Sequence, residues 1–270
     1  MYGKYTVPNE VIKMVELEKK LTSDGSTLAT IMLRPTENFY YDITPYDAIP
    51  FANTGGDGIH FCFLTEFGQV KDLNEAPIVC VSPTNDPPIR LVANNIQDFL
   101  RLVISVPHAE CLENWWTFDS EEQINQNLEE MKEFEDVSWN QLRQKIRDEF
   151  KSYFNLEPLD YLPYVKALKE QRAKEVALAT KDGLGVMDGN AESSYQPYEF
   201  TYNLDEQEIQ NMKDFLVRAN LTEKLAFLRD VNFYHTVSST EKNGLFEFVL
   251  EVLNDLQLHE EYKRLKARVY

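Results

Sequence analysis

The chain has 270 residues, of which 43% are hydrophobic and 12% aromatic, and this content is ample for a packed core. Its 45 Asp and Glu residues outnumber its 27 Lys and Arg residues, which gives a formal net charge of −18 at pH 7. Binding to a phosphate backbone needs clustered positive charge, so the composition argues against direct nucleic-acid binding. It favours a basic protein partner, unless the acidity serves solubility alone.

The sequence also predicts a cytoplasmic protein without a membrane segment. No window approaches about 20 uninterrupted apolar residues, the length that a transmembrane helix needs, and the N-terminus lacks the apolar core of a signal peptide. Three cysteines, Cys62, Cys80 and Cys111, are odd in number and lack the spacing of a metal site. We therefore expect reduced, mostly buried thiols, and neither a metal nor another cofactor.

The first elements in chain order are a helix and an ambiguous apolar run. Apolar residues at helical spacing predict a helix over 9–21. The run at 27–33 is too short for its periodicity to distinguish a strand from a helix. Two prolines then favour an extended or turning passage up to residue 50.

The next stretch, 49–64, is an apolar run, a glycine-rich corner and a second apolar run. The corner contains Gly55, Gly56 and Gly58, and glycine adopts positive φ at no steric cost. The residues after it alternate between two largely apolar faces, which predicts a central strand covered on both sides.

Further strands are predicted at 76–82 and 89–93, and a helix capped by Asn94 or Asn95 follows over 96–103. Because the strands are joined by short turns, we expect a mostly antiparallel sheet.

From residue 119 onward the patterns are almost only helical. Helices are predicted to start at capping-type sequences near 119, 138 and 203, and others cover 164–180, 221–228 and 245–256. The Gly-rich stretch at 181–197 is the best candidate for a linker or loop. We therefore predict an α+β fold, with a small sheet and flanking helices in residues 1–115 and a helical region over 116–270.

The order of features over 49–104 resembles the SUKH superfamily, bacterial immunity proteins related to fungal regulators of cell-wall glucan synthesis. The family pairs a Pro-Phe-Ala entry and glycine corner with a later apolar-Val-Ala strand and a Phe-Leu helix. The matching residues are Pro50, Phe51, Ala52, Gly55, Gly56, Val92, Ala93, Phe99 and Leu100. The helical region lies outside this resemblance.

The resemblance implies a binding function without catalysis. Proteins of this group neutralise toxins, often secreted nucleases, or act as scaffolds in cell-wall regulation. An acidic protein that covers the basic cleft of a nuclease is physically reasonable, because complementary charge speeds encounter and competes with the nucleic acid.

Several residues have both a functional and a structural interpretation, and the structural one is favoured. The glycine corner is not followed by the Lys-Ser/Thr pair or the helix of a phosphate-binding loop, so we interpret it as a turn. His60 with Cys62 and Cys80 is a thin signal for a metal site. An acid–base pair of Asp57 and His60 lacks a supporting nucleophile.

Two features are candidates for contact with a partner. Trp115 and Trp116 fit an interface, where tryptophan often dominates binding, although such a pair more often closes a core between domains. The acidic run at 129–136, with Glu129, Glu130 and Glu133, fits a basic partner, although a solvated helix face is the commoner explanation.

Three functional hypotheses follow. The first is an immunity or antitoxin-like factor for a basic toxin, and the second is an intracellular scaffold or regulator that uses the helical region to bind. The third is an enzyme, which predicts a deep pocket of convergent polar groups with shifted pKa values.

Overall fold

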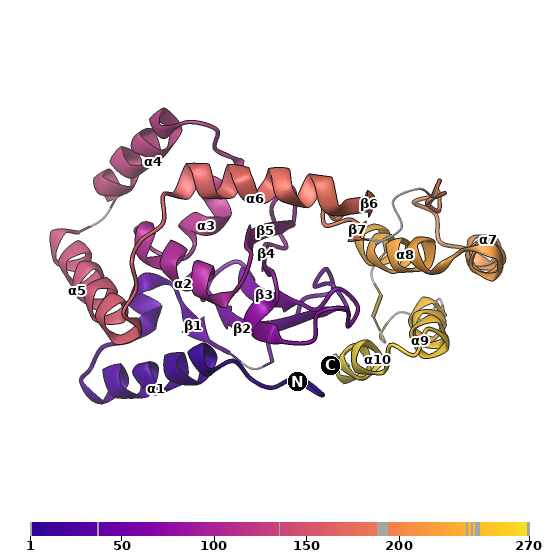
Figure 1. Cartoon of the computed structure of the whole chain (residues 1–270), viewed down its shortest axis with the longest axis horizontal. Helices are drawn as coiled ribbons and strands as arrows, with labels where there is room; N and C mark the ends of the chain where they lie inside the picture. The colour runs from indigo at the N-terminus through magenta and orange to yellow at the C-terminus, as the bar shows by residue number, and fades with distance from the viewer. Residues whose placement is uncertain are drawn as a thin grey trace.

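A computed structural model describes residues 2–36, 38–134, 136–187, 194–235, 237–238, 240 and 244–268. Its centre is a five-stranded sheet in which each strand pairs antiparallel with the next along the chain (Figure 1). The strands are β1 (Arg34–Pro35), β2 (Ala48–Asn53), β3 (His60–Leu64), β4 (Ile78–Val81) and β5 (Ile89–Ala93). The predicted α+β class with an antiparallel sheet in the N-terminal half is therefore confirmed.

The described residues otherwise form helices and one small hairpin. The α-helices are α1 (Asn9–Ser23), α2 (Ile96–Ser105), α3 (Cys111–Asn114), α4 (Glu121–Phe134), α5 (Val137–Phe154), α6 (Tyr161–Glu175), α7 (Glu206–Arg218), α8 (Leu221–Tyr234), α9 (Leu245–Asp255) and α10 (His259–Ala267). The short 3-10 helices are η1 (Leu28–Ile31), η2 (Leu73–Glu75) and η3 (Trp115–Thr117), and the hairpin pairs β6 (Val176–Leu178) with β7 (Val186–Met187).

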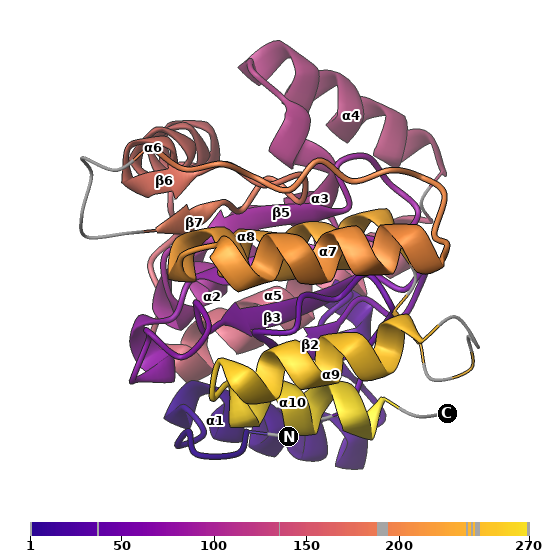
Figure 2. The same cartoon turned by 90° about the vertical axis from the view of Figure 1, so that its right-hand side faces the viewer.

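One face of the sheet is covered by α6, the hairpin and the C-terminal helices. In Figure 2, α7 to α10 lie in front of the strands. Side chains of this face, including Cys62 and Leu64 of β3, pack against Leu168 of α6 and Leu184 of the hairpin. The four C-terminal helices also enclose an apolar cluster of their own.

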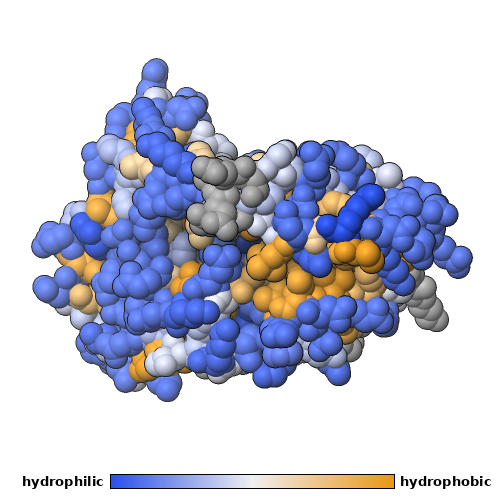
Figure 3. Space-filling model, turned by 45° about the vertical axis from the view of Figure 1, so that its right-hand side comes forward, coloured by the Kyte–Doolittle hydropathy of each residue, from blue (hydrophilic) through white to orange (hydrophobic). Residues whose placement is uncertain are grey.

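Part of that second cluster reaches the surface. Between α7 and α9 the surface shows an apolar hollow, which is orange in Figure 3.

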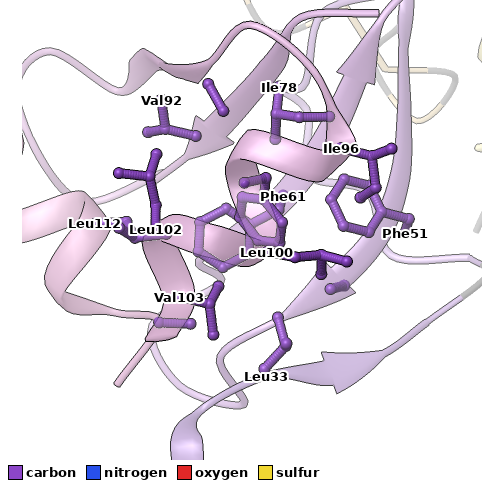
Figure 4. Packing of buried hydrophobic residues seen from close by; sticks show 14 of the residues in the cluster. Leu33, Phe51, Phe61, Ile78, Val92, Ile96, Leu100, Leu102, Val103 and Leu112 are labelled. Carbon is purple, nitrogen blue, oxygen red and sulfur yellow. The ribbon is translucent and has the colours of Figure 1, made fainter. Parts of the chain in front are cut away.

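The opposite face of the sheet carries the main hydrophobic core. Phe51 of β2 and Phe61 of β3 contact Phe99 of α2, with ring centroids 5.3 and 4.9 Å apart. Figure 4 shows how the apolar side of α2 lies across the strands. Phe51 and Phe99 are 48 residues apart in sequence, and their contact brings the stretches 49–64 and 89–103 together in the core. Every residue of β3 is buried, which explains why its sequence is apolar on both sides.

The core continues beyond residue 115, the predicted end of the first domain. Ile146 and Phe150 of α5 and Val165 of α6 belong to the same apolar cluster as α1 and α2. The helical region therefore divides by packing: α5 and α6 contribute to the core around the sheet, while α7 to α10 surround the second cluster.

Several predicted boundaries shift in the structure. The ambiguous run at 27–33 contains η1, and the predicted helix 164–180 starts earlier, at Tyr161, and gives way to β6 at Val176. Asp205, rather than Asn203, caps α7. Residues 181–187 of the predicted linker form the hairpin turn and β7, and 188–193 lie outside the described residues.

The glycine corner joins β2 to β3 as predicted. Gly55 and Gly58 have φ of +89° and +72°, whereas Gly56 does not have a positive φ. A Cβ atom on Gly58 would lie 2.6 Å from Tyr41 Cζ, and one on Gly56 would contact nothing within 4 Å. The corner is thus shaped by backbone conformation and close packing.

These two glycines provide a matched test of the corner. We expect Gly58→Ala to lower the free energy of unfolding by about 1–2 kcal/mol, the cost of a left-handed conformation for a residue with a Cβ atom. Gly56→Ala is expected to change it by less than about 0.5 kcal/mol. Urea unfolding of both variants measures the difference, and equal effects would contradict this account of the corner.

Candidate protein-binding surface

The predicted acidic residues Glu129, Glu130 and Glu133 lie on the outer side of α4, together with Glu121 and Glu122, which the sequence patterns did not single out for partner contact. Glu121, Glu122, Glu129, Glu130 and Glu133 are all exposed, and we call this set the acidic ridge. Ile124 is buried and Leu128 and Met131 are half-buried on the other side of the helix. The spacing of the apolar residues fixes how the helix lies, and the five carboxylates therefore face solvent. Glu135, part of the same acidic run, lies outside the described residues.

Only part of the negative charge on the ridge is compensated within the helix. Lys132 Nζ lies 2.7 Å from Glu129 Oε1, and Gln126 donates a hydrogen bond to Glu130. Because both members of the Lys132–Glu129 pair are exposed, the pair is weak and leaves both groups available to other partners. The ridge can therefore attract a basic surface.

An exposed apolar pair follows the ridge directly in the chain. Val137 and Trp139, in the first turn of α5, have 72% and 43% of their surface exposed, and we call them the apolar corner. The end of α4 and the start of α5 border a common groove of about 300 Å³, lined among others by Met131 and Asn140. A large aromatic side chain beside exposed charges is typical of the residues that dominate protein interfaces.

The predicted tryptophan pair serves the core instead. Trp115 is only 3% exposed, packs on Tyr161 and donates a hydrogen bond to Asn127. Trp116 is half-buried and donates to the Leu91 carbonyl of edge strand β5, and the Lys169 ammonium lies 3.8 Å from the centroid of its ring. These contacts favour the packing interpretation over the partner-binding one.

The other sequence candidates are also held by structural contacts. His60 is buried, with Nδ1 2.7 Å from the Gly58 carbonyl oxygen and Nε2 3.0 Å from Thr44 Oγ1, whereas Asp57 is exposed in the corner. Burial lowers the pKa of His60 to about 4, so the ring is neutral at pH 7. Cys62 and Cys80 point to opposite faces of the sheet, because Cys80 pairs with Phe61. The structure therefore does not bring these three residues together as metal ligands.

A buried group of charges joins the sheet to the C-terminal helices. Its members, which we call the ionic cluster, are Asp47, Glu66, Arg172, Asp182 and Arg229. Arg229 of α8 reaches the carboxylates of Asp47 and Glu66, each at 3.0 Å, and that of Asp182 at 3.6 Å. Arg172 of α6 holds the other oxygen of Glu66 at 2.6 Å.

The surroundings of Arg229 in the ionic cluster favour its charged form. Burial alone would lower the pKa of Arg229, but the carboxylates of Asp47, Asp182 and Glu66 outweigh it and raise the pKa. Next to them, burial raises the pKa of Asp230 to about 6, although the Lys181 N–H partly opposes this rise. The cluster positions the helices on the sheet, and its arginines are at most 8% exposed, so it acts as a structural support.

The grooves on the surface are open and mixed in character. One of about 610 Å³ lies between the start of α4 and α6, and its charged residues are Asp119, Glu121, Lys166, Lys169 and Glu170. Lys169 is already engaged with Trp116. In the described part of the chain, no group of three or more His, Cys, Asp or Glu residues could hold a metal ion.

Sequence reasoning singled out three of the five ridge residues, Glu129, Glu130 and Glu133, and missed Glu121, Glu122 and the apolar corner. Helical periodicity places Trp139 on the same stripe as Ile146 and Phe150, which are buried, but the first turn of α5 extends past the core.

Within the described ranges, no helix is both long and apolar enough to cross a membrane. Searches with the whole chain found no matching family model and no matching curated protein.

Proposed function

We propose that the protein is a non-enzymatic, cytoplasmic binding factor of the immunity or antitoxin type, which neutralises a basic protein such as a nuclease toxin. The observation that carries this proposal is the acidic ridge next to the apolar corner. The ridge supplies long-range attraction, and Trp139 supplies an anchor that can be desolvated on contact. The net charge of −18 acts in the same direction.

The SUKH-like residues support the same class of function in a different part of the chain. They form the sheet and α2, whose side chains are buried, so their contribution to binding is to hold the scaffold rigid. The ridge and corner lie on α4 and α5, which pack on that scaffold through Ile124 and Ile146. A rigid support lowers the entropy lost on binding.

The first experiment is capture of partners from native cell lysate at low and at high salt. We expect a basic toxin domain to be retained at low salt and its activity to be blocked by the protein. Charge reversal in the triple variant E129K/E130K/E133K is expected to weaken binding at least about 10-fold, and W139A by a similar factor.

A control variant, E175K/E199K/D214K, makes the same change in net charge at three exposed acidic residues away from the ridge. If the control weakens capture as much as the ridge variant does, overall charge and not this surface is responsible. Recovery of envelope or housekeeping proteins in place of a toxin would reject the immunity function in favour of a scaffold. Absence of any salt-sensitive partner would reject the proposal as well.

A further inference from the structure

The hollow between α7 and α9 is a second exposed apolar surface, at the opposite end of the molecule from α4 (Figures 1 and 3). It is a groove of about 470 Å³ whose floor includes Phe248 and Val252 of α9 and Leu216 of α7. Val217 on its border is 87% exposed, and nearby in the chain Leu221 is 61% exposed. Large aliphatic side chains exposed beside an apolar groove are typical of a surface that another protein covers.

The charges around this groove are separated by sign. Lys213 of α7 and Lys224 of α8 form a basic rim, and Glu251 and Asp255 of α9 form an acidic rim. None of these four side chains has an ion pair or hydrogen bond to another described residue, although Lys213 lies 5.6 Å from the centroid of the Phe248 ring. Both rims are therefore free to pair with charges of a partner.

A groove with one basic and one acidic rim is complementary to itself. If two copies face each other across a two-fold axis that runs along the groove, the basic rim of each copy lies over the acidic rim of the other. The same rotation places α7 of one copy over α9 of its partner, so that Val217 faces the partner's groove. Charge complementarity of this kind selects one partner and one orientation.

We propose that the protein self-associates as a two-fold symmetric dimer through the α7–α9 groove. The dimer leaves both acidic ridges exposed, so it is compatible with the binding function proposed above without depending on it. Repulsion between two chains of charge −18 opposes association, but at physiological ionic strength charges beyond about 8 Å are screened, whereas paired rim charges are in contact.

Analytical ultracentrifugation over a range from about 1 to 100 µM tests the proposal, because the dimer fraction depends on protomer concentration. We expect the wild type to shift from monomer to dimer. V217E is expected to weaken dimerisation at least about 10-fold by placing a carboxylate in the apolar contact. The matched control I12E makes the same kind of change at Ile12 of α1, which is 46% exposed and does not line the groove, and should dimerise normally.

Charge exchange provides the sharper test. The variant K213E/K224E has two acidic rims and E251K/D255K has two basic rims, so each should remain monomeric alone. Mixed together they should form a heterodimer, which also shows that both variants are folded. A wild type that stays monomeric over the whole range, or a mixture that does not associate, would overturn the proposal.

Discussion

Replacing Arg229 with methionine is expected to lower the free energy of unfolding by about 3–5 kcal/mol, because removal of one partner leaves buried charges uncompensated. The side chain of Arg229 is 1% exposed and lies within 4.0 Å of three carboxylates. Methionine fills a similar volume without the charge. Asp47, which is fully buried, would then lose its arginine, whereas Glu66 would keep Arg172. A loss of this size is a third or more of the stability of many domains.

Three further variants, R101M, D47N and D47N/R229M, separate this effect from a general effect of removing arginine. Arg101→Met removes an arginine whose pair with Asp98 is partly exposed, and we expect a change of no more than about 1 kcal/mol. D47N/R229M removes charge from both sides and should be less destabilised than the sum of D47N and R229M. Urea unfolding of all four variants measures these differences. An R229M variant no less stable than R101M would contradict the assigned role of the cluster.

The sheet could be predicted because each strand can be recognised from residues that are adjacent in sequence. β2 to β5 are short apolar runs bounded by turn residues, and β3 is apolar on both sides because it is central in the sheet and covered on both faces. The glycine corner was also predictable, since the backbone there requires φ values that favour glycine. The same short-range patterns located α2, with Asn95 as its cap.

The ionic cluster could not be predicted, because its members come from distant parts of the chain. Asp47 and Arg229 are separated by 182 residues, and no periodicity relates them. Their charges look like ordinary surface residues until the C-terminal helices pack on the sheet. Glu129, Glu130 and Glu133 of the acidic ridge could be singled out for the opposite reason, since they are close in sequence. Trp139 was missed because helical spacing indicates which side of a helix is apolar but not where the core ends.

Acidification from pH 7 to about 4.5 is expected to destabilise the protein through two buried histidines. Burial lowers the pKa of both His60 and His108 to about 4, and Arg143 and Arg147 add to the effect at His108. The unfolded chain takes up protons near pH 6.5 and the folded chain does so only near pH 4, so stability is lost as the pH falls between these values. Each lowering corresponds to at most about 3 kcal/mol.

One carboxyl group works in the opposite direction. Burial raises the pKa of Asp230 to about 6, so the folded protein takes up this proton before the unfolded chain does, and acidification stabilises the fold by up to about 3 kcal/mol. Burial also raises the pKa of Glu110 and lowers that of His235, and these two shifts change stability in opposite directions. Since two histidines oppose one carboxyl group, the net expectation is a loss of stability on acidification.

Variants that lack the two histidines or Asp230 test which of these groups controls the change in stability on acidification. Asparagine at position 60 keeps a donor for the Gly58 carbonyl, and phenylalanine at 108 keeps the ring volume without charge. We expect H60N/H108F to lose the decline on acidification and even to gain stability down to pH 5, because Asp230 then dominates. Conversely, D230N should steepen the decline. Urea unfolding at several pH values decides the matter: if all three proteins show the same pH dependence, other groups control it and the buried histidines do not.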